Sequence, residues 1–266
     1  MSVDGYIMRY GTPNLEALLL PKFFLLALIF VPSSLPSEVL ENFQNRRHYV
    51  GTYFQVASYF YEEPNVMNKE SQLPFIGVGR KGILTSKQNP FLYEFDIQYG
   101  QTDYFGSAIT TSDPTYILNT NLKKSWQVNE FDLSFGLGYR HLKDDWGGKQ
   151  TALGNYTYDR VSEYLFLSAG LTRFTSSQPN FSINYRQLIR GKQTSYLQYI
   201  PGYYNATNPQ KTGSGLTAEY YLMNDFSIFI DYWNIERSDN DRQGQGIYEP
   251  LNHTTQIGLR YRLLFE

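Results

Sequence analysis

The chain has 266 residues, enough for one large all-β domain or two domains of ordinary size. Its mean hydropathy of −0.44 excludes a helical membrane protein, and its formal net charge of −2 gives no electrostatic basis for binding nucleic acid. The absence of cysteine excludes a disulfide scaffold, a thiol nucleophile, a Cys-ligated metal site and a lipoprotein anchor. Aromatic residues make up 17% of the chain, more than a soluble core needs.

The first feature along the chain is an apolar run at Phe23–Val31, preceded by Lys22 and followed by small residues and prolines. A basic flank, a short apolar stretch and a small-residue exit are typical of a cleaved secretory signal. The run is too short for a membrane-spanning helix, which needs about 20 apolar residues. We expect residues 1–37 to form the signal peptide with an upstream extension, and the mature protein to begin between Ser33 and Glu38.

After residue 48 the sequence shows no helical periodicity and instead alternates between apolar and polar residues in short segments. Gly, Pro, Asn, Asp and Ser bound these segments, as they bound β-strands in general. The pattern predicts ten strands, at 48–61, 74–84, 90–101, 115–127, 130–142, 160–174, 180–191, 213–223, 225–237 and 252–265.

The third predicted strand shows the alternation clearly. Its apolar face carries Phe91, Tyr93, Phe95, Ile97 and Tyr99, and its polar face carries Glu94, Asp96 and Gln98. The second predicted strand has the weakest pattern, and the seventh loses its phase near Leu188 and Ile189.

The connections between the predicted strands alternate in length without exception. Short links follow the even-numbered strands, and long links follow the odd-numbered ones, at Glu62–Leu73, Thr102–Pro114, Lys143–Asp159, Lys192–Thr212 and Ser238–Leu251. A soluble sandwich has no reason to sort its loops in this way, whereas a transmembrane barrel does. The sequence therefore predicts a single antiparallel β-barrel of ten strands, with eight or twelve as alternatives.

The last predicted strand carries the most specific signal. Its apolar face is Thr255, Ile257, Leu259, Tyr261, Leu263 and Phe265, opposite a face with Gly258 and two arginines. This strand resembles the C-terminal insertion signal of Gram-negative outer-membrane β-barrel proteins, whose candidate elements here are Gly258, Tyr261, Leu263 and Phe265. The signal normally ends on the aromatic residue, whereas Glu266 follows here.

The resemblance is to a broad class, the small porin-like, OmpA-type or omptin-sized barrels. It implies a location in the outer membrane, short periplasmic turns and long extracellular loops. Residues 38–47 would then be a short periplasmic segment, and 48–266 the transmembrane barrel. The implied partners are outer-membrane lipid, lipopolysaccharide and the barrel assembly machinery.

The polar faces of the predicted strands would line the barrel's lumen. Charges of both signs lie on them, at Glu94, Asp96, Lys123, Asp132, Arg140, Arg186, Glu219, Asp231, Arg260 and Arg262. One interpretation is a set of structural ion pairs in a filled barrel. The other is a narrow aqueous pore whose fixed charges set its selectivity. The sequence indicates no cofactor and no metal site.

Three functions remain open from the sequence. The first is a structural or small porin-like barrel without catalysis, and the second is a surface adhesin that acts through its external loops. The third is a rim-site hydrolase, as in omptins or lipid A deacylases, using Asp144, Asp145 and His253. The G-x-G-x-x-G match at Gly77–Gly82 is interpreted as strand glycines because no helix follows it.

Overall fold

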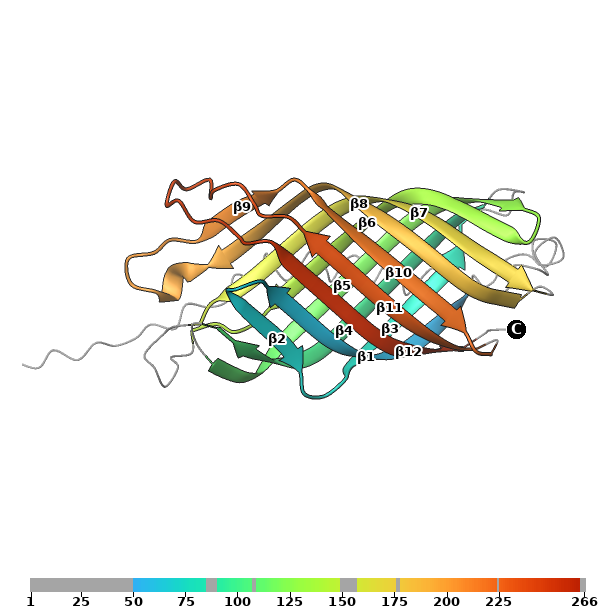
Figure 1. Cartoon of the computed structure of the whole chain (residues 1–266), viewed down its shortest axis with the longest axis horizontal. Helices are drawn as coiled ribbons and strands as arrows, with labels where there is room; N and C mark the ends of the chain where they lie inside the picture. Colours follow the sequence, from blue (N-terminus) through green and yellow to red (C-terminus); the bar gives the residue numbers. More distant parts are fainter. Residues whose placement is uncertain are drawn as a thin grey trace, which may run out of the picture. The chain divides into compact units, whose positions relative to one another are not determined.

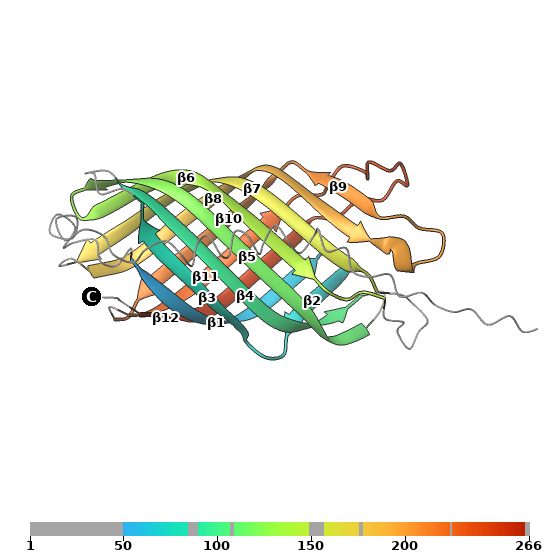
Figure 2. The same ribbon diagram turned by 180° about the vertical axis from the view of Figure 1, so that it is seen from behind.

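The computed structural model describes residues 50–84, 90–106, 109–148, 157–175, 178–223 and 225–263. These residues form a closed antiparallel β-barrel whose strands are strongly tilted (Figures 1 and 2). The strands are β1 (Gly51–Glu63), β2 (Met67–Ser71), β3 (Phe75–Ile83), β4 (Phe91–Phe105), β5 (Ile109–Val128), β6 (Phe131–Asp144), β7 (Asp159–Thr175), β8 (Gln178–Tyr196), β9 (Ala206–Gln210), β10 (Gly213–Tyr221), β11 (Phe226–Ile235) and β12 (Asn252–Leu263). The predicted signal peptide, the predicted periplasmic segment and Phe265 lie outside the described residues.

The barrel wall has ten positions in its circumference. It closes where β12 pairs with β1, and β8 pairs with β10 on the far side. Each of two positions is occupied by two short strands. Strands β2 and β3 share the position between β1 and β4, because both pair with both neighbours. Strands β9 and β10 share the position next to β8, because both pair with it. The ten predicted strands therefore correspond to the ten wall positions.

Three of the five predicted long loops are shorter in the structure, because strands extend into them. The region predicted as the loop Thr102–Pro114 is mostly the ends of β4 and β5, and the one predicted at Lys192–Thr212 contains β9. These extensions carry polar side chains inward, and the hydroxyls of Thr102 and Thr115 lie 3.2 Å apart as a hydrogen-bonded pair. These segments are polar, and for that reason the sequence predicted loops. In the structure they continue the barrel wall on the loop side, with polar side chains facing the interior.

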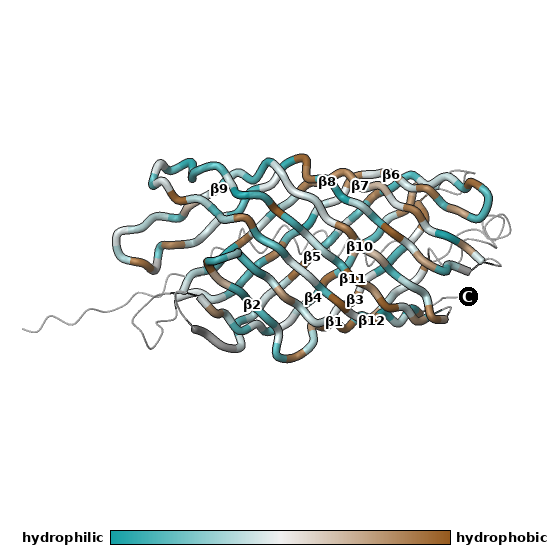
Figure 3. The backbone as a smooth tube through the Cα atoms, viewed as in Figure 1, coloured by the Kyte–Doolittle hydropathy of each residue, from teal (hydrophilic) through white to brown (hydrophobic). Residues whose placement is uncertain are grey.

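The two faces of the barrel wall differ sharply in polarity. Along the strands, hydrophilic and hydrophobic residues are interspersed (Figure 3). Large apolar side chains are exposed on the outside, including Phe54, Val56, Val78, Leu122, Phe135, Leu137, Ile183, Ile230 and Ile257, whereas charged and amide side chains are buried inside. A closed sheet satisfies its backbone hydrogen bonds internally, and an apolar exterior suits hydrocarbon. The chain is therefore a transmembrane β-barrel of the outer-membrane type. Among the described residues, no helix is long and apolar enough to cross a membrane.

The phase loss of the seventh predicted strand has a structural cause. The register between β7 and β8 shifts where Leu165 pairs with Arg190 and Phe166 pairs with Leu188. Ile189 and Arg190 are both exposed, while Leu188 is buried inside. This β-bulge inserts one residue and resets the alternation, so that the residues beyond it point inward again.

Glycines let bulky rings lie flat on the inner wall. Gly79 pairs with Tyr53, and a Cβ atom at Gly79 would lie 2.2 Å from the tyrosine ring. Gly215 pairs with Trp233 in the same manner, and a Cβ atom there would lie 2.9 Å from the indole. The segment with the G-x-G-x-x-G match is β3, so its glycines serve strand packing, as the sequence indicated.

Candidate functional site

The lumen gathers the barrel's charged side chains and is the candidate functional site. Its contents fall into three layers along the barrel. We call them the short-turn layer, near the turns that follow β3, β5, β7 and β10; the central layer, around Asp231; and the loop layer, around Arg160. Each layer contains ion pairs between strands that are not neighbours in the wall.

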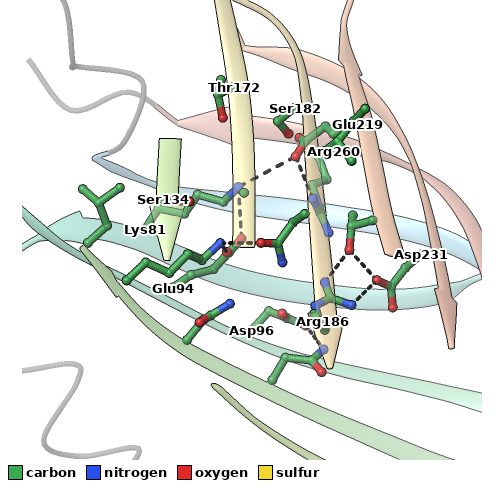
Figure 4. Close-up of a pocket in the computed structure, with 18 of the residues that line it drawn as sticks. Lys81, Glu94, Asp96, Ser134, Thr172, Ser182, Arg186, Glu219, Asp231 and Arg260 are labelled. Atoms are coloured by element: carbon green, nitrogen blue, oxygen red, sulfur yellow. Dashed lines mark hydrogen bonds and ion pairs between the residues drawn. The ribbon is translucent and has the colours of Figure 1, made fainter. Parts of the chain in front are cut away.

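In the short-turn layer, three cations share two carboxylates (Figure 4). The Lys81 Nζ lies 3.0 Å from a Glu94 oxygen and 3.8 Å from a Glu219 oxygen. The Lys123 Nζ lies 3.5 Å from Glu94, and the Arg260 guanidinium lies 2.9 Å from Glu219. Because β3 and β10 are well separated around the wall, the bridge from Lys81 to Glu219 crosses the lumen.

A cavity of about 100 Å³ lies within this layer, room for several water molecules. Its walls carry the charged groups just described together with amides, including Asn121 and Asn184. The lining continues to strand ends on the short-turn side, at Leu92, Thr172, Tyr221 and Arg262. The cavity therefore extends toward the end of the barrel that has the short turns.

In the central layer, Asp231 is the shared acceptor. Its carboxylate lies 2.7 Å from the Arg186 guanidinium on one side and 3.4 Å from the Arg140 guanidinium on the other. It also accepts hydrogen bonds from the Thr217 hydroxyl at 2.6 Å and from the Trp233 indole N–H at 3.0 Å. These contacts tie β6, β8, β10 and β11 together across the lumen.

The Trp233 indole occupies the middle of the central layer. It is 2% exposed and belongs to a buried cluster with Tyr164, Phe166, Leu188 and Ile235. The guanidinium carbons of Arg140 and Arg186 lie 5.0 Å and 4.9 Å from the centre of its ring. Cations this close to an aromatic ring are a stabilising arrangement, so ring and charges together fill the lumen at this height.

In the loop layer, one ion pair joins opposite walls. The Arg160 guanidinium on β7 lies 2.6 Å from Glu63 on β1 and 3.1 Å from Asp144 on β6. Lys69 on β2 contacts Asp144 from the other side and lies 4.6 Å above the Trp146 ring. All of these charged side chains are almost completely buried, so this layer also closes the lumen.

The loop between β11 and β12 covers the loop layer with one more acid. Burial raises the pKa of Glu249 above its ordinary value; the nearby Arg160 lowers it and Glu63 raises it further. The Ser195 hydroxyl donates a hydrogen bond of 2.9 Å to this carboxyl group. Glu63, Asp144 and Glu249 therefore lie around Arg160 in the loop layer.

All ten side chains of the predicted lumen network lie on the inner face of the wall. Nine line the cavity or meet at Asp231, and Asp132 is also buried there, at 3% exposure. Sequence reasoning missed Lys81, Lys69, Glu63, Asp144 and Arg160 as lumen residues. Lys81 lies in the strand with the weakest pattern, and Lys69 lies in a segment expected to be a loop. Asp144 and Arg160 continue the inward parity of their strands, a signal that could have identified them.

The residues of the hydrolase hypothesis are not brought together. Asp144 points into the lumen, where it binds Lys69 and Arg160. His253 faces outward instead, with its Nδ1 atom 3.0 Å from the Tyr232 hydroxyl and its ring stacked on the tyrosine ring. Asp145 lies in the following loop, 3.4 Å from the Lys143 ammonium group. The barrel wall separates Asp144 from His253, so the predicted Asp–His constellation is wrong.

The described part of the predicted insertion signal lies on the last strand. Tyr261 and Leu263 point outward and are 46% and 37% exposed, whereas Gly258 points inward. A Cβ atom at Gly258 would lie 2.3 Å from the Val56 carbonyl oxygen on β1. Glycine at this position therefore allows the first and last strands to approach where the barrel closes.

Comparison with known proteins finds no matching family model and no matching curated protein. Among solved structures, the chain is similar to an outer membrane protease from Escherichia coli, with a TM-score of 0.41, 9% identity and coverage of 80% of this chain and 94% of that one. It is similar to an outer membrane channel from Pseudomonas putida F1, with a TM-score of 0.39, 11% identity and coverage of 80% and 96%. It is also similar to outer membrane phospholipase A from Escherichia coli, with a TM-score of 0.31, 10% identity and coverage of 82% of this chain and 99% of that one. This likeness transfers no activity.

Proposed function

We propose that the protein is a structural outer-membrane β-barrel of a Gram-negative bacterium whose lumen is closed, and that it is not a constitutively open porin. The observation that carries this proposal is the set of ion pairs across the lumen, in particular Arg160 with Glu63 and Arg140 with Asp231. An open pore would place water where these groups meet.

The size of the barrel supports the same conclusion. Barrels of about eight strands have interiors that side chains can fill, whereas wide aqueous channels need about sixteen or more. With ten wall positions, the lumen is narrow enough for Trp233 and the Arg140 side chain to be 2% and 1% exposed. The cavity in the short-turn layer reaches this central layer, because Asp231 and Phe166 belong to its lining, and we interpret it as a recess in the lumen.

We expect the purified wild-type barrel to give no steady conductance in planar lipid bilayers at neutral pH. The physical reason is that ions would have to cross two layers of buried, paired charges and aromatic rings. The measurement is single-channel recording over a range of voltages, with a known porin as positive control for insertion. A stable ohmic conductance of the wild-type protein would overturn the closed-lumen proposal and favour the pore.

A second candidate function is surface recognition, favoured by the loop-side end of the barrel. The hairpin of β8 and β9 is extended by the loop at 238–249, whose backbone bonds to β9 through Asp239 N–H to Pro209 at 3.1 Å. This structure exposes the aromatic side chains of Tyr203 and Tyr204, at 52% and 77%. Exposed aromatic residues on a rigid support suit contact with another molecule.

The orientation of the barrel decides whether that hairpin is available at the cell surface. We expect an epitope tag inserted at Gly202 to be recognised by antibody on intact cells, because Gly202 lies in an exposed turn with open space around it. A tag at Asp225, in a short turn, should be recognised only after the outer membrane is permeabilised. The reverse labelling would invert the barrel and remove the surface candidate.

A further inference from the structure

We propose that the connection between β8 and β9, residues 197–205, is a binding site for an uncharged carbohydrate, with the rings of Tyr203 and Tyr204 as the surface on which a sugar stacks. We call this connection the hairpin tip. The inference rests on the second candidate function, surface recognition, and names the class of ligand that this surface would take. It follows from the composition of the hairpin, its support, the exposure of its rings and its small size.

The hairpin tip lies in the middle of an uncharged stretch of sequence. Between Lys192 and Lys211 there is no acidic residue, no basic residue and no histidine, and tyrosine, glutamine, asparagine and threonine are frequent. Tyrosine and asparagine are also enriched in antibody binding loops, where rigid amphipathic rings and adaptable polar groups make the contacts. Nucleic acids, phosphate groups and acidic sugars are bound mainly by lysine and arginine. The composition therefore favours an uncharged ligand.

The neighbouring loop at 238–249 holds the hairpin in one conformation, and the two lie side by side in Figure 1. The Gln245 side chain accepts a hydrogen bond of 3.2 Å from the Tyr204 backbone N–H and donates one of 3.1 Å to the Tyr204 carbonyl oxygen. The Asn208 amide donates to two backbone carbonyl oxygens of the same loop, at 3.3 Å and 2.7 Å. A surface that is already ordered loses little conformational entropy on binding, so the tip is preorganised.

The rings at the hairpin tip are presented to solvent. Tyr203 and Tyr204 are 52% and 77% exposed, and the space around Gly202 next to them is open. The face of an aromatic ring carries partial negative charge. A sugar ring has one face of C–H groups with partial positive charge, so the two rings can stack without any charged side chain.

An amide lies beside the rings and can bind the hydroxyl groups of a sugar. Gln198 is exposed, and its side-chain oxygen accepts a hydrogen bond of 3.5 Å from the Asn205 amide, at the limit of hydrogen bonding. An amide both donates and accepts, as a hydroxyl group does. Exchanging this long amide contact for contacts with sugar hydroxyls therefore costs little.

The small size of the hairpin tip favours a sugar over a folded protein as the ligand. A stable protein interface takes about 20–30 residues from each partner. The exposed turn consists of residues 201–204, with Gln198 beside it. A sugar ring is close in size to a tyrosine ring, so this surface is sufficient for it.

The test measures binding of the full-length barrel, reconstituted in phosphatidylcholine vesicles, to an array of neutral and acidic oligosaccharides. A vesicle displays many copies, which strengthens a weak single-site interaction, and vesicles without the barrel serve as the blank. We expect binding to neutral oligosaccharides that persists from about 0.05 to 0.5 M sodium chloride, because salt screens only charges. Binding to acidic oligosaccharides alone, or to none, would overturn the proposal.

Substitutions of one exposed ring assign the site. Tyr204→Ala should lower binding at least about tenfold, as removal of a central aromatic contact does, whereas Tyr204→Phe retains the ring and should bind well. The matched control is Tyr220→Ala, which removes a ring that is 54% exposed near the short-turn end of β10 and should bind as the wild type does. Unchanged binding by the Tyr204→Ala barrel would overturn the assignment to the hairpin tip.

A charge next to the hairpin tests whether the ligand is anionic. Arg242 is exposed, and its backbone N–H donates a hydrogen bond of 3.2 Å to the Thr207 carbonyl oxygen. Arg242→Gln should leave binding unchanged, and a loss of binding would mean an anionic ligand and overturn the proposal.

The vesicle test does not depend on how the barrel is oriented in the cell. Reversed labelling of the tag at Gly202 would remove the surface candidate. Normal labelling without binding to neutral oligosaccharides would overturn the carbohydrate alone and leave a protein as the partner to seek.

Discussion

Replacing Asp231 by alanine is expected to lower the free energy of unfolding by about 3–5 kcal/mol, the range for removing one partner of a buried ion pair. The carboxylate binds Arg186 at 2.7 Å and Arg140 at 3.4 Å, and Arg140 is 1% exposed. Without Asp231, two guanidinium groups would face each other in a buried part of the lumen. The hydrogen bonds from Thr217 and Trp233 would also lose their acceptor.

The measurement is urea unfolding of the barrel in detergent, monitored by tryptophan fluorescence. The control is Asp239→Ala, which removes an ion pair with Lys211 at 2.5 Å whose two side chains are 54% and 73% exposed. Exposed pairs contribute about 0–1 kcal/mol, so this variant should unfold close to the wild type. Equal effects of the two substitutions would mean that water replaces Asp231 and that the central layer is wet.

Replacing Trp233 by alanine should have the second large effect, on stability and on permeation together. A buried tryptophan truncated to alanine costs about 3–5 kcal/mol, and the indole lies among Tyr164, Phe166 and two guanidinium groups. Its removal leaves a cavity in the central layer, next to the recess that already opens toward the short turns. Water can then reach the charges around Asp231.

We therefore expect Trp233→Ala to show brief conducting events in planar bilayers that the wild type lacks. The matched control is Tyr232→Ala, the preceding residue on β11, whose side chain faces outward and is 38% exposed. It removes a large aromatic ring without touching the lumen, so it should remain silent. If Trp233→Ala is also silent, the loop layer around Arg160 is sufficient to close the barrel.

The strand alternation made the inner face of the barrel predictable, because a period of two assigns each residue of a long strand to one side. Asp231 and Arg260 were placed in the lumen on this basis, and both lie there. The alternation predicted the ion-pair partners of these residues less well. Arg260 does bind Glu219, but Asp231 binds Arg186 on β8 and Arg140 on β6. Which side chains meet across a lumen depends on how neighbouring strands are staggered in the closed wall. The alternation along a single strand carries no information about that stagger.

The two short strands that sequence reasoning missed, β2 with its Lys69 among them, lack the pattern of a lipid-facing strand. Strand β2 reads Met67–Ser71 and β9 reads Ala206–Gln210, and neither has an apolar outer face. The alternation that marks a lipid-facing strand is therefore absent, although the backbone is paired. The hydrolase hypothesis failed for a different reason: it combined Asp144 and His253 by their distance from the rim without applying the parity of their strands.

The long-range contacts inside the barrel also constrain how it assembles. Arg140 meets Asp231 across 91 residues of chain and Gln98 meets Gln256 across 158, while Gln55 meets Arg260 across 205 at the seam between β1 and β12. Until β11 and β12 are in place, the cations on β6 and β8 have no central carboxylate. Contacts of such long sequence separation form late and slow the folding reaction. Insertion of β11 and β12 is therefore the step that neutralises the charges of the interior. A sheet that is only partly paired retains unpaired charges, and these oppose its entry into lipid.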